Sequence, residues 1–98
     1  MNIIKLEPRI KLATDKQYPD LLSYVSLKLI DEHERYLTIN GFTIRKSKYN
    51  GEPYLVPPSK RTGKGFFKFT LIEKSLWKEI EREALAEYEK ESIPVVEG

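Results

Sequence analysis

The sequence predicts an α+β fold, in which an antiparallel meander of about five strands is followed by one C-terminal amphipathic helix. Up to residue 71, short apolar stretches alternate with turn residues, a pattern typical of strands joined by hairpins. From about residue 75, apolar residues recur every three or four positions, which is the spacing of a helix. Because 98 residues are enough for only one hydrophobic core, we expect a single domain over residues 1–92 and a loose tail over residues 93–98.

The first expected strand joins Ile3–Leu6 to Arg9–Leu12, with Pro8 between the two halves. Proline cannot donate a ladder hydrogen bond, so this strand should be bulged or lie at an edge of the sheet. After a loop, the second strand is expected over Leu21–Ile30, and a polar hairpin turn, Asp31–Glu34, follows it.

The third expected strand covers Tyr36–Lys46. Its apolar residues change parity at Asn40-Gly41, and one extra residue in a β-bulge is the simplest explanation. Next along the chain, the Asn-Gly pair within Tyr49–Glu52 predicts a tight hairpin.

Two shorter strands should complete the sheet. One is expected over Pro53–Val56 and should stop at Pro57-Pro58, because two prolines fix the backbone and set the direction in which the chain leaves the sheet. Gly63-Lys64-Gly65 then predicts a turn into a fifth strand, Phe66–Leu71.

The helix is expected from about Ser75 to Lys90. Its apolar stripe should pack on the sheet with Trp77 as an anchor, while its glutamates face solvent. Ser75 is one candidate N-cap, and Thr70 with Glu73 forms a competing capping box. The stripe consists of Leu76, Trp77, Ile80, Ala84, Leu85 and Tyr88.

In three of the expected strands, apolar residues occupy both even and odd positions and so point to both faces of the sheet; these strands are 21–30, 53–56 and 66–71. Both faces of such a sheet need cover, and a single helix covers only one of them. A second copy of the chain is the simplest shield for the rest, so the sequence predicts a homodimer.

The composition excludes several classes of protein. With no cysteine, the chain has no disulfide, no thiolate nucleophile and no cysteine-based zinc site. No stretch approaches the apolar length of a membrane span, and the N-terminus lacks the apolar block of a signal peptide, so we expect a cytoplasmic protein.

The net charge of +2 conceals a basic middle and an acidic C-terminal region. Residues 41–70 carry 7 basic side chains and 1 acidic one, whereas residues 71–98 carry 4 basic and 8 acidic ones. Such asymmetry favours a polyanionic partner, above all nucleic acid. The basic residues of this middle region are the candidate nucleic-acid-binding residues: Arg45, Lys46, Lys48, Lys60, Arg61, Lys64 and Lys68.

Hairpins with basic tips suit the phosphate backbone, where each neutralised phosphate releases counterions. Gly63 and Gly65 would let backbone N–H groups approach an anion, and Tyr49, Tyr54 and Phe66 would stack on unpaired bases if exposed. The alternative is that these lysines only keep the protein soluble and protect sheet edges.

The segment Tyr54-Leu55-Val56-Pro57-Pro58-Ser59-Lys60-Arg61-Thr62 resembles the SpoVG family of bacterial septation and stage V sporulation regulators, in which a short strand is followed by Pro-Ser-Lys-Arg-Thr and a glycine-containing turn. Val25–Leu29, Leu37–Ile44 and Ala84–Tyr88 are similar to the family's second strand, third strand and helix end. The resemblance covers about two-thirds of the chain, which would be a divergent member. It implies a homodimer of antiparallel sheet and C-terminal helix that binds nucleic acid in a regulatory role, and the preference between DNA and RNA stays open.

Other chemistry finds little support in the sequence. Gly63-Lys64-Gly65 lacks the spacing of a P-loop, and a hairpin turn is its usual meaning. His33 lies beside carboxylates, but consecutive turn residues point in different directions, so a solvated turn is favoured over a metal or catalytic site. Ser59 follows two prolines, and no second histidine exists to activate it. We therefore expect no enzyme, metal, cofactor or small-molecule substrate.

A protein–protein adaptor is the alternative function. It would use a sheet edge and exposed aromatic residues, and its binding would depend on Tyr49, Tyr54 or Phe66 rather than on the lysines.

Overall fold

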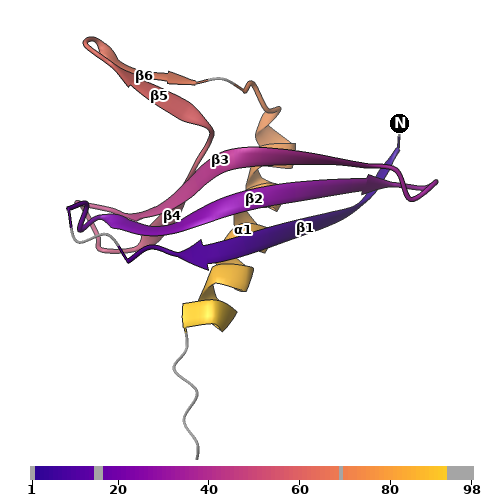
Figure 1. The fold of residues 1–98 in the computed structure, drawn as a ribbon, viewed down its shortest axis with the longest axis horizontal. Coiled ribbons are helices and arrows are strands. Elements are labelled where there is room, and N and C mark those ends of the chain that lie inside the picture. Colours follow the sequence, from indigo (N-terminus) through magenta and orange to yellow (C-terminus); the bar gives the residue numbers. More distant parts are fainter. Residues whose placement is uncertain (1, 15–16, 69, 93–98) are drawn as a thin grey trace, which may run out of the picture.

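A computed structural model describes residues 2–14, 17–68 and 70–92 (Figure 1). Four antiparallel strands form one sheet in the order β1-β2-β3-β4, and two further strands form a separate hairpin. The strands are β1 (Ile3–Leu12), β2 (Leu21–Asp31), β3 (Tyr36–Lys46), β4 (Pro53–Val56), β5 (Ser59–Thr62) and β6 (Gly65–Lys68), and the helix is α1 (Lys74–Ser92). The predicted α+β fold class, an antiparallel sheet followed by one C-terminal helix, is confirmed. The expected tail over residues 93–98 lies outside the described residues.

The edge position predicted for the first strand is confirmed. β1 pairs only with β2, and Pro8 lies opposite Leu27 in that pairing. Because an edge strand needs hydrogen bonds on one side only, it tolerates a residue that cannot donate one.

The predicted β-bulge in the third strand is also confirmed. Val25 of β2 pairs with Phe42, but Leu27 pairs with Ile39, so Asn40 and Gly41 together oppose Ser26. Gly41 has φ of 99°, a conformation that side chains disfavour and glycine adopts readily. The extra residue in the bulge shifts the alternation of β3 by one position, so that apolar residues before and after the bulge point to the core.

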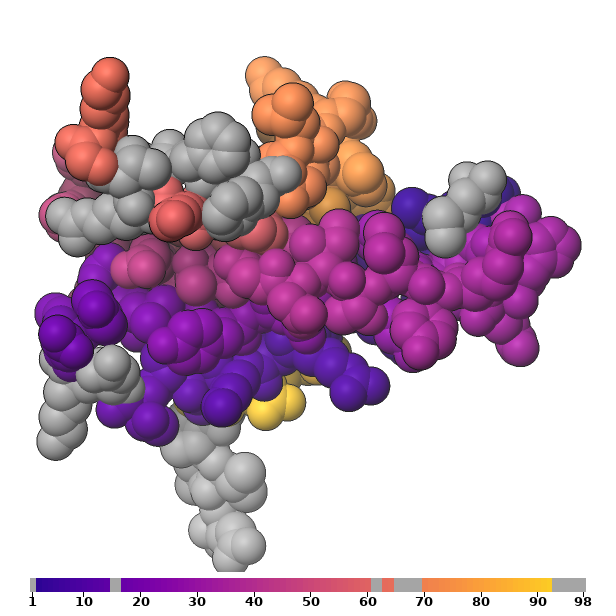
Figure 2. All heavy atoms as spheres, turned by 45° about the horizontal axis from the view of Figure 1, so that its top comes forward, coloured from indigo at the N-terminus to yellow at the C-terminus, as the bar shows by residue number. Residues whose placement is uncertain are grey.

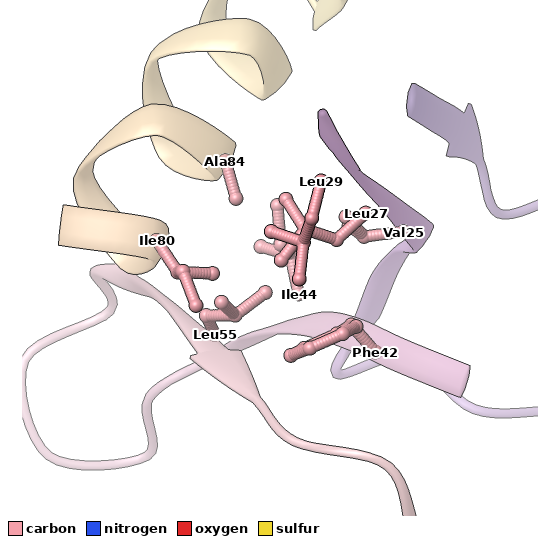
Figure 3. Close-up of a cluster of buried hydrophobic side chains, with 8 residues drawn as sticks. All are labelled: Val25, Leu27, Leu29, Phe42, Ile44, Leu55, Ile80 and Ala84. Atoms are coloured by element: carbon pink, nitrogen blue, oxygen red, sulfur yellow. The ribbon is translucent and has the colours of Figure 1, made fainter. Parts of the chain in front are cut away.

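The core lies between the sheet and α1, which runs behind the sheet and across its strands in Figure 1. Trp77 packs here as predicted, with its ring stacked on Phe42 at 6.3 Å between centroids. Figure 3 shows how the buried side chains of sheet and helix point toward one another. They are Val25, Leu27, Leu29, Phe42, Ile44, Leu55, Ile80 and Ala84.

The helix start differs from both expected caps. Glu73 caps α1: its backbone oxygen accepts from Trp77 N at 2.8 Å, and its carboxylate accepts from Ser75 N and Leu76 N, each at 3.0 Å. Ser75 is therefore inside the first turn, where its hydroxyl donates to the same carboxylate. These hydrogen bonds hold the pKa of Glu73 below its ordinary value.

One helix glutamate does not face solvent as expected. Glu81 Oε2 accepts a hydrogen bond from Leu55 N at 3.2 Å. β4 is the outer strand of the sheet, so this contact satisfies an N–H that no further strand pairs.

The fifth strand of the predicted meander is not part of the main sheet. β6 pairs instead with β5, a strand that the sequence did not predict, and β6 ends at Lys68 with Thr70 and Leu71 outside any strand. Pro58 is buried against the bulge at Gly41, so the chain turns off the sheet after β4 and folds back on itself.

The face of the sheet turned away from α1 is less apolar than expected. In β2, every second residue from Leu21 to Asp31 is buried, whereas Tyr24 between them is 46% exposed and Lys28 is half-buried.

No helix in the described part of the chain is long and apolar enough to cross a membrane.

Candidate nucleic-acid interface

The candidate binding residues fall on two hairpins. Lys46 ends β3 and Lys48 lies in the turn between β3 and β4, whereas Lys60 and Lys64 belong to the β5–β6 hairpin. Both hairpin tips lie at the same end of the longest axis (Figure 1). Figure 2 shows the described atoms of the β5–β6 hairpin rising beside the sheet at this end.

Internal hydrogen bonds hold the β3–β4 turn in shape. Ser47 N donates to Glu52 O at 2.9 Å, and Gly51 N donates to Ser47 O at 3.0 Å. The Ser47 hydroxyl accepts from Tyr49 N, and the Asn50 side chain accepts from Glu52 N. Gly51 supplies the positive φ, 73°, that the predicted Asn-Gly turn needs.

This turn presents an aromatic ring and cations beside a hollow of about 570 Å³. Tyr49 is 99% exposed and thus fully available for stacking. The hollow is lined by Lys46, Lys48, Tyr49 and Tyr54, together with the carboxylates of Asp20 and Glu52 and neighbouring residues. Cations next to accessible rings can hold a phosphate and an unpaired base at the same time.

An intramolecular partner holds the side chain of Arg45 in place. Its guanidinium donates to Asp20 Oδ2 at 2.9 Å, and its side chain is only 27% exposed. This hydrogen bond is the main reason why the pKa of Asp20 is lowered. Lys46 N also donates to Asp20 O at 2.8 Å, so the pair fastens the β1–β2 loop to the end of β3.

The β5–β6 hairpin turns at Gly63-Lys64, as predicted for this glycine-flanked segment. Lys60 and Lys64 are exposed, and a side chain placed on Gly63 would meet nothing within 4 Å. Arg61, Phe66 and Lys68 lie in β5 and β6 by their backbone, but their side chains lie outside the described part of the structure.

His33 lies in an exposed turn, as predicted. Its backbone N–H donates to the buried carboxylate of Asp31, and its ring lies 3.6 Å from Glu32. Within residues 2–14, 17–68 and 70–92, no group of three or more His, Asp or Glu side chains could hold a metal ion.

Sequence reasoning missed a second set of cations, on β1 and β2. Arg9, Lys11 and Lys28 lie on the sheet face opposite α1. The signal that could have found them is the alternation of β1, where Lys5, Glu7, Arg9 and Lys11 interleave with Leu6, Pro8, Ile10 and Leu12.

Comparison with known proteins leaves this chain without a match: no family model, curated protein or solved structure resembles it at a significant level. Its function must therefore be inferred from the residues and their placement.

Proposed function

We propose that this protein is a non-enzymatic, homodimeric nucleic-acid-binding regulator that contacts the phosphate backbone through its basic hairpins. The observations that carry this proposal are that the tips of the two hairpins lie at one end of the molecule (Figure 1) and that Lys46, Lys48 and Lys60, which belong to these hairpins, are exposed. The proposal covers DNA and RNA, and titrations with both decide which of them is preferred. A cytoplasmic location is part of the proposal.

The lysines and Arg45 have different roles in this proposal. Lys46, Lys48, Lys60 and Lys64 contact phosphates, together with Arg61 and Lys68 of the same hairpin. Arg45 supports them from behind, because its ion pair with Asp20 fixes the end of β3 where the turn begins. Phosphate contacts of this kind position a protein without reading bases, so affinity should fall steeply with salt.

We also propose that the chain is a divergent SpoVG-like protein. The segment 54–62, which carries the resemblance, spans the end of β4, the two prolines and all of β5. Its lysine and arginine thus follow directly on Pro58, where the chain leaves the sheet, which agrees with a binding loop displayed beside a sheet. The regulatory role is inferred from this resemblance.

The proposal of a homodimer is supported by the way the β5–β6 hairpin projects from the sheet (Figure 1). An isolated two-stranded hairpin is only marginally stable in water, so it gains from a partner surface. Leu71, which follows the hairpin, is 97% exposed and would be covered by the same contact. Light scattering at micromolar concentration should give twice the monomer mass of 11.5 kDa, and a particle of 11.5 kDa would refute the dimer.

The binding function is tested by charge reversal at Lys60→Glu with Arg61→Glu. Fluorescence anisotropy with single- and double-stranded DNA and RNA at two salt concentrations should show weaker binding of every sequence. A matched control, Lys74→Glu with Lys90→Glu, makes the same change in net charge on α1 and should bind much more like the parent. If the Lys60/Arg61 variant bound with the affinity of the parent at ~0.15 M salt, this hairpin would not be part of the interface.

The full exposure of Tyr49 favours a second candidate function, a protein–protein adaptor. An interface of this kind takes its affinity from aromatic anchors rather than from lysines. Binding of the partner would then resist salt and be lost on Tyr49→Ala or Tyr54→Ala, while charge reversal at Lys60 and Arg61 would leave it intact.

A further inference from the structure

The sheet face opposite α1 carries cations and tyrosines in a region that the hairpin interface does not include. We call it the helix-free face; it is turned toward the viewer in Figure 1. Directly paired residues of antiparallel strands project to the same side, and the register pairs Lys11 with Tyr24 and Glu7 with Lys28. Tyr36 lies diagonally from Lys28 on β3, and the Lys28 ammonium lies 4.4 Å from the centre of its ring.

The charge of this face is predominantly positive. Glu7 is the one carboxylate that the described strands place on it, and Lys5 Nζ already binds Glu7 at 3.1 Å. That ion pair lowers the pKa of Glu7, and the positive potential of Lys28 and Arg9 lowers it further. Arg9, Lys11 and Lys28 therefore leave the face with excess positive charge, which is complementary to a polyanion.

The β-bulge gives this face a hollow of about 290 Å³. It lies where Asn40 and Gly41 together oppose Ser26, and Arg9, Lys11 and Tyr24 also line it. This volume is at the lower end of the range for ligand pockets, roughly 300–1,000 Å³, which suits one flat ring and its phosphate better than an enclosed metabolite.

A single strand fits these features better than a duplex. Tyr24 is 46% and Tyr36 64% exposed, so both rings offer a stacking surface. A duplex hides the faces of its bases, whereas every unpaired base has a face to stack on. Tyr36 pairs with Ile30, which lies six residues along β2 from Tyr24, so the two backbone positions are about 20 Å apart, a span of a few nucleotides.

We propose that the helix-free face binds single-stranded nucleic acid, with Tyr24 stacked on a base over the bulge hollow and Arg9 and Lys11 on the adjoining phosphates. Lys28 and Tyr36 continue the path along β2 and β3. The inference rests on the proposed function in taking nucleic acid as the partner, but its residues differ from those of the hairpins. Stacking and phosphate contacts do not read the base edge, so this site should tolerate any sequence.

The test measures anisotropy with two probes, a labelled oligothymidine of about 12 nucleotides and a labelled DNA duplex. Tyr24→Ala should weaken oligothymidine binding by roughly 5- to 100-fold, the range expected for loss of one stacked base. Tyr24→Phe keeps the ring and should bind like the parent. Arg9→Gln with Lys11→Gln should weaken oligothymidine binding and reduce its salt dependence, and duplex binding should not depend on Tyr24.

Circular dichroism and the fluorescence of Trp77 in the core show whether each variant is folded. Parental binding of oligothymidine by folded Tyr24→Ala would overturn the inference. Binding of the duplex but not of oligothymidine by the parent protein would also overturn the inference, and in that case the proposed function of the hairpins would stand. Loss of binding to both probes only in Lys60→Glu with Arg61→Glu would assign the single strand to the hairpins. A change of oligomeric state in Tyr24→Ala would instead assign this face to the dimer interface.

Discussion

Pro58 packs directly against Gly41, so the exit of the chain from the sheet rests on the bulge in β3. A Cβ atom placed on Gly41 would lie 3.3 Å from Pro58 Cβ, and Gly41 also has φ of 99°. The bulge therefore has two functions: it sets which residues of β3 face the core, and it leaves room for Pro58, where the chain departs from the sheet.

Gly41→Ala should destabilise the fold by about 1–3 kcal/mol, because the new methyl group meets Pro58 and the backbone conformation is unfavourable for alanine. Chemical denaturation followed by circular dichroism measures this destabilisation. Gly63→Ala is the matched control, since nothing lies within 4 Å of its Cβ position. Equal stability of the two variants would mean that Pro58 does not rest on Gly41 in solution.

Asp31 should make stability depend on pH. Burial of this carboxyl opposes ionisation, but hydrogen bonds from His33 N, Arg35 N and the Arg35 guanidinium outweigh burial and hold its pKa below the ordinary value. Its stabilising contribution is thus complete above the unfolded-state pKa of about 4 and disappears as the pH falls through the lowered folded-state value.

Asp31→Asn should accordingly lower the denaturation midpoint at pH 7 and flatten the decline of stability in acid. Urea denaturation of parent and variant between pH 7 and pH 2 measures both effects. Glu32→Gln, at an exposed position in the same turn, should leave the parental pH profile unchanged. A variant profile that still falls as steeply as the parent's would locate the acid sensitivity elsewhere.

Phe42→Ala should destabilise the protein by about 3–5 kcal/mol, because the ring is buried and stacks on Trp77. Removal of the phenylalanine ring should also shift the emission of Trp77 to the red in whatever fraction remains folded. Tyr36→Ala removes a ring from the exposed face and should change stability far less. An unshifted emission spectrum in folded Phe42→Ala would contradict the stacked arrangement.

Arg45 and the turn lysines should behave differently in binding. Lys46→Gln with Lys48→Gln should reduce the slope of log affinity against log salt by roughly 0.9 for each phosphate that is no longer neutralised. Arg45→Gln should leave that slope near the parental value and lower stability instead, because it breaks the ion pair with Asp20. Measured slopes for duplex DNA separate the two effects, and an equal reduction of the slope in both variants would place Arg45 among the phosphate-binding residues.

Local sequence patterns predicted the features that depend on neighbouring residues. The parity change at Asn40-Gly41 predicted the bulge, the apolar spacing predicted the helix, and Pro8 indicated an edge strand. In each case the cause lies within a few residues, so the pattern is visible in the chain itself.

Interactions between distant segments could not be predicted in this way. The β5–β6 pairing depends on the contact between Pro58 and Gly41, and the ion pair of Arg45 depends on Asp20, 25 residues away. The cations of the helix-free face were visible in the alternation of β1 but were missed, because the apolar residues of β2 suggested that both faces need cover.

Each border of the main sheet has a position that hinders the addition of a further strand. At one border Pro8 has no N–H to offer, and at the other the carboxylate of Glu81 occupies the N–H of Leu55. Edge-to-edge pairing is hindered at these two positions, so we expect copies of this chain to meet through faces or projecting loops rather than by continuous pairing of strand edges.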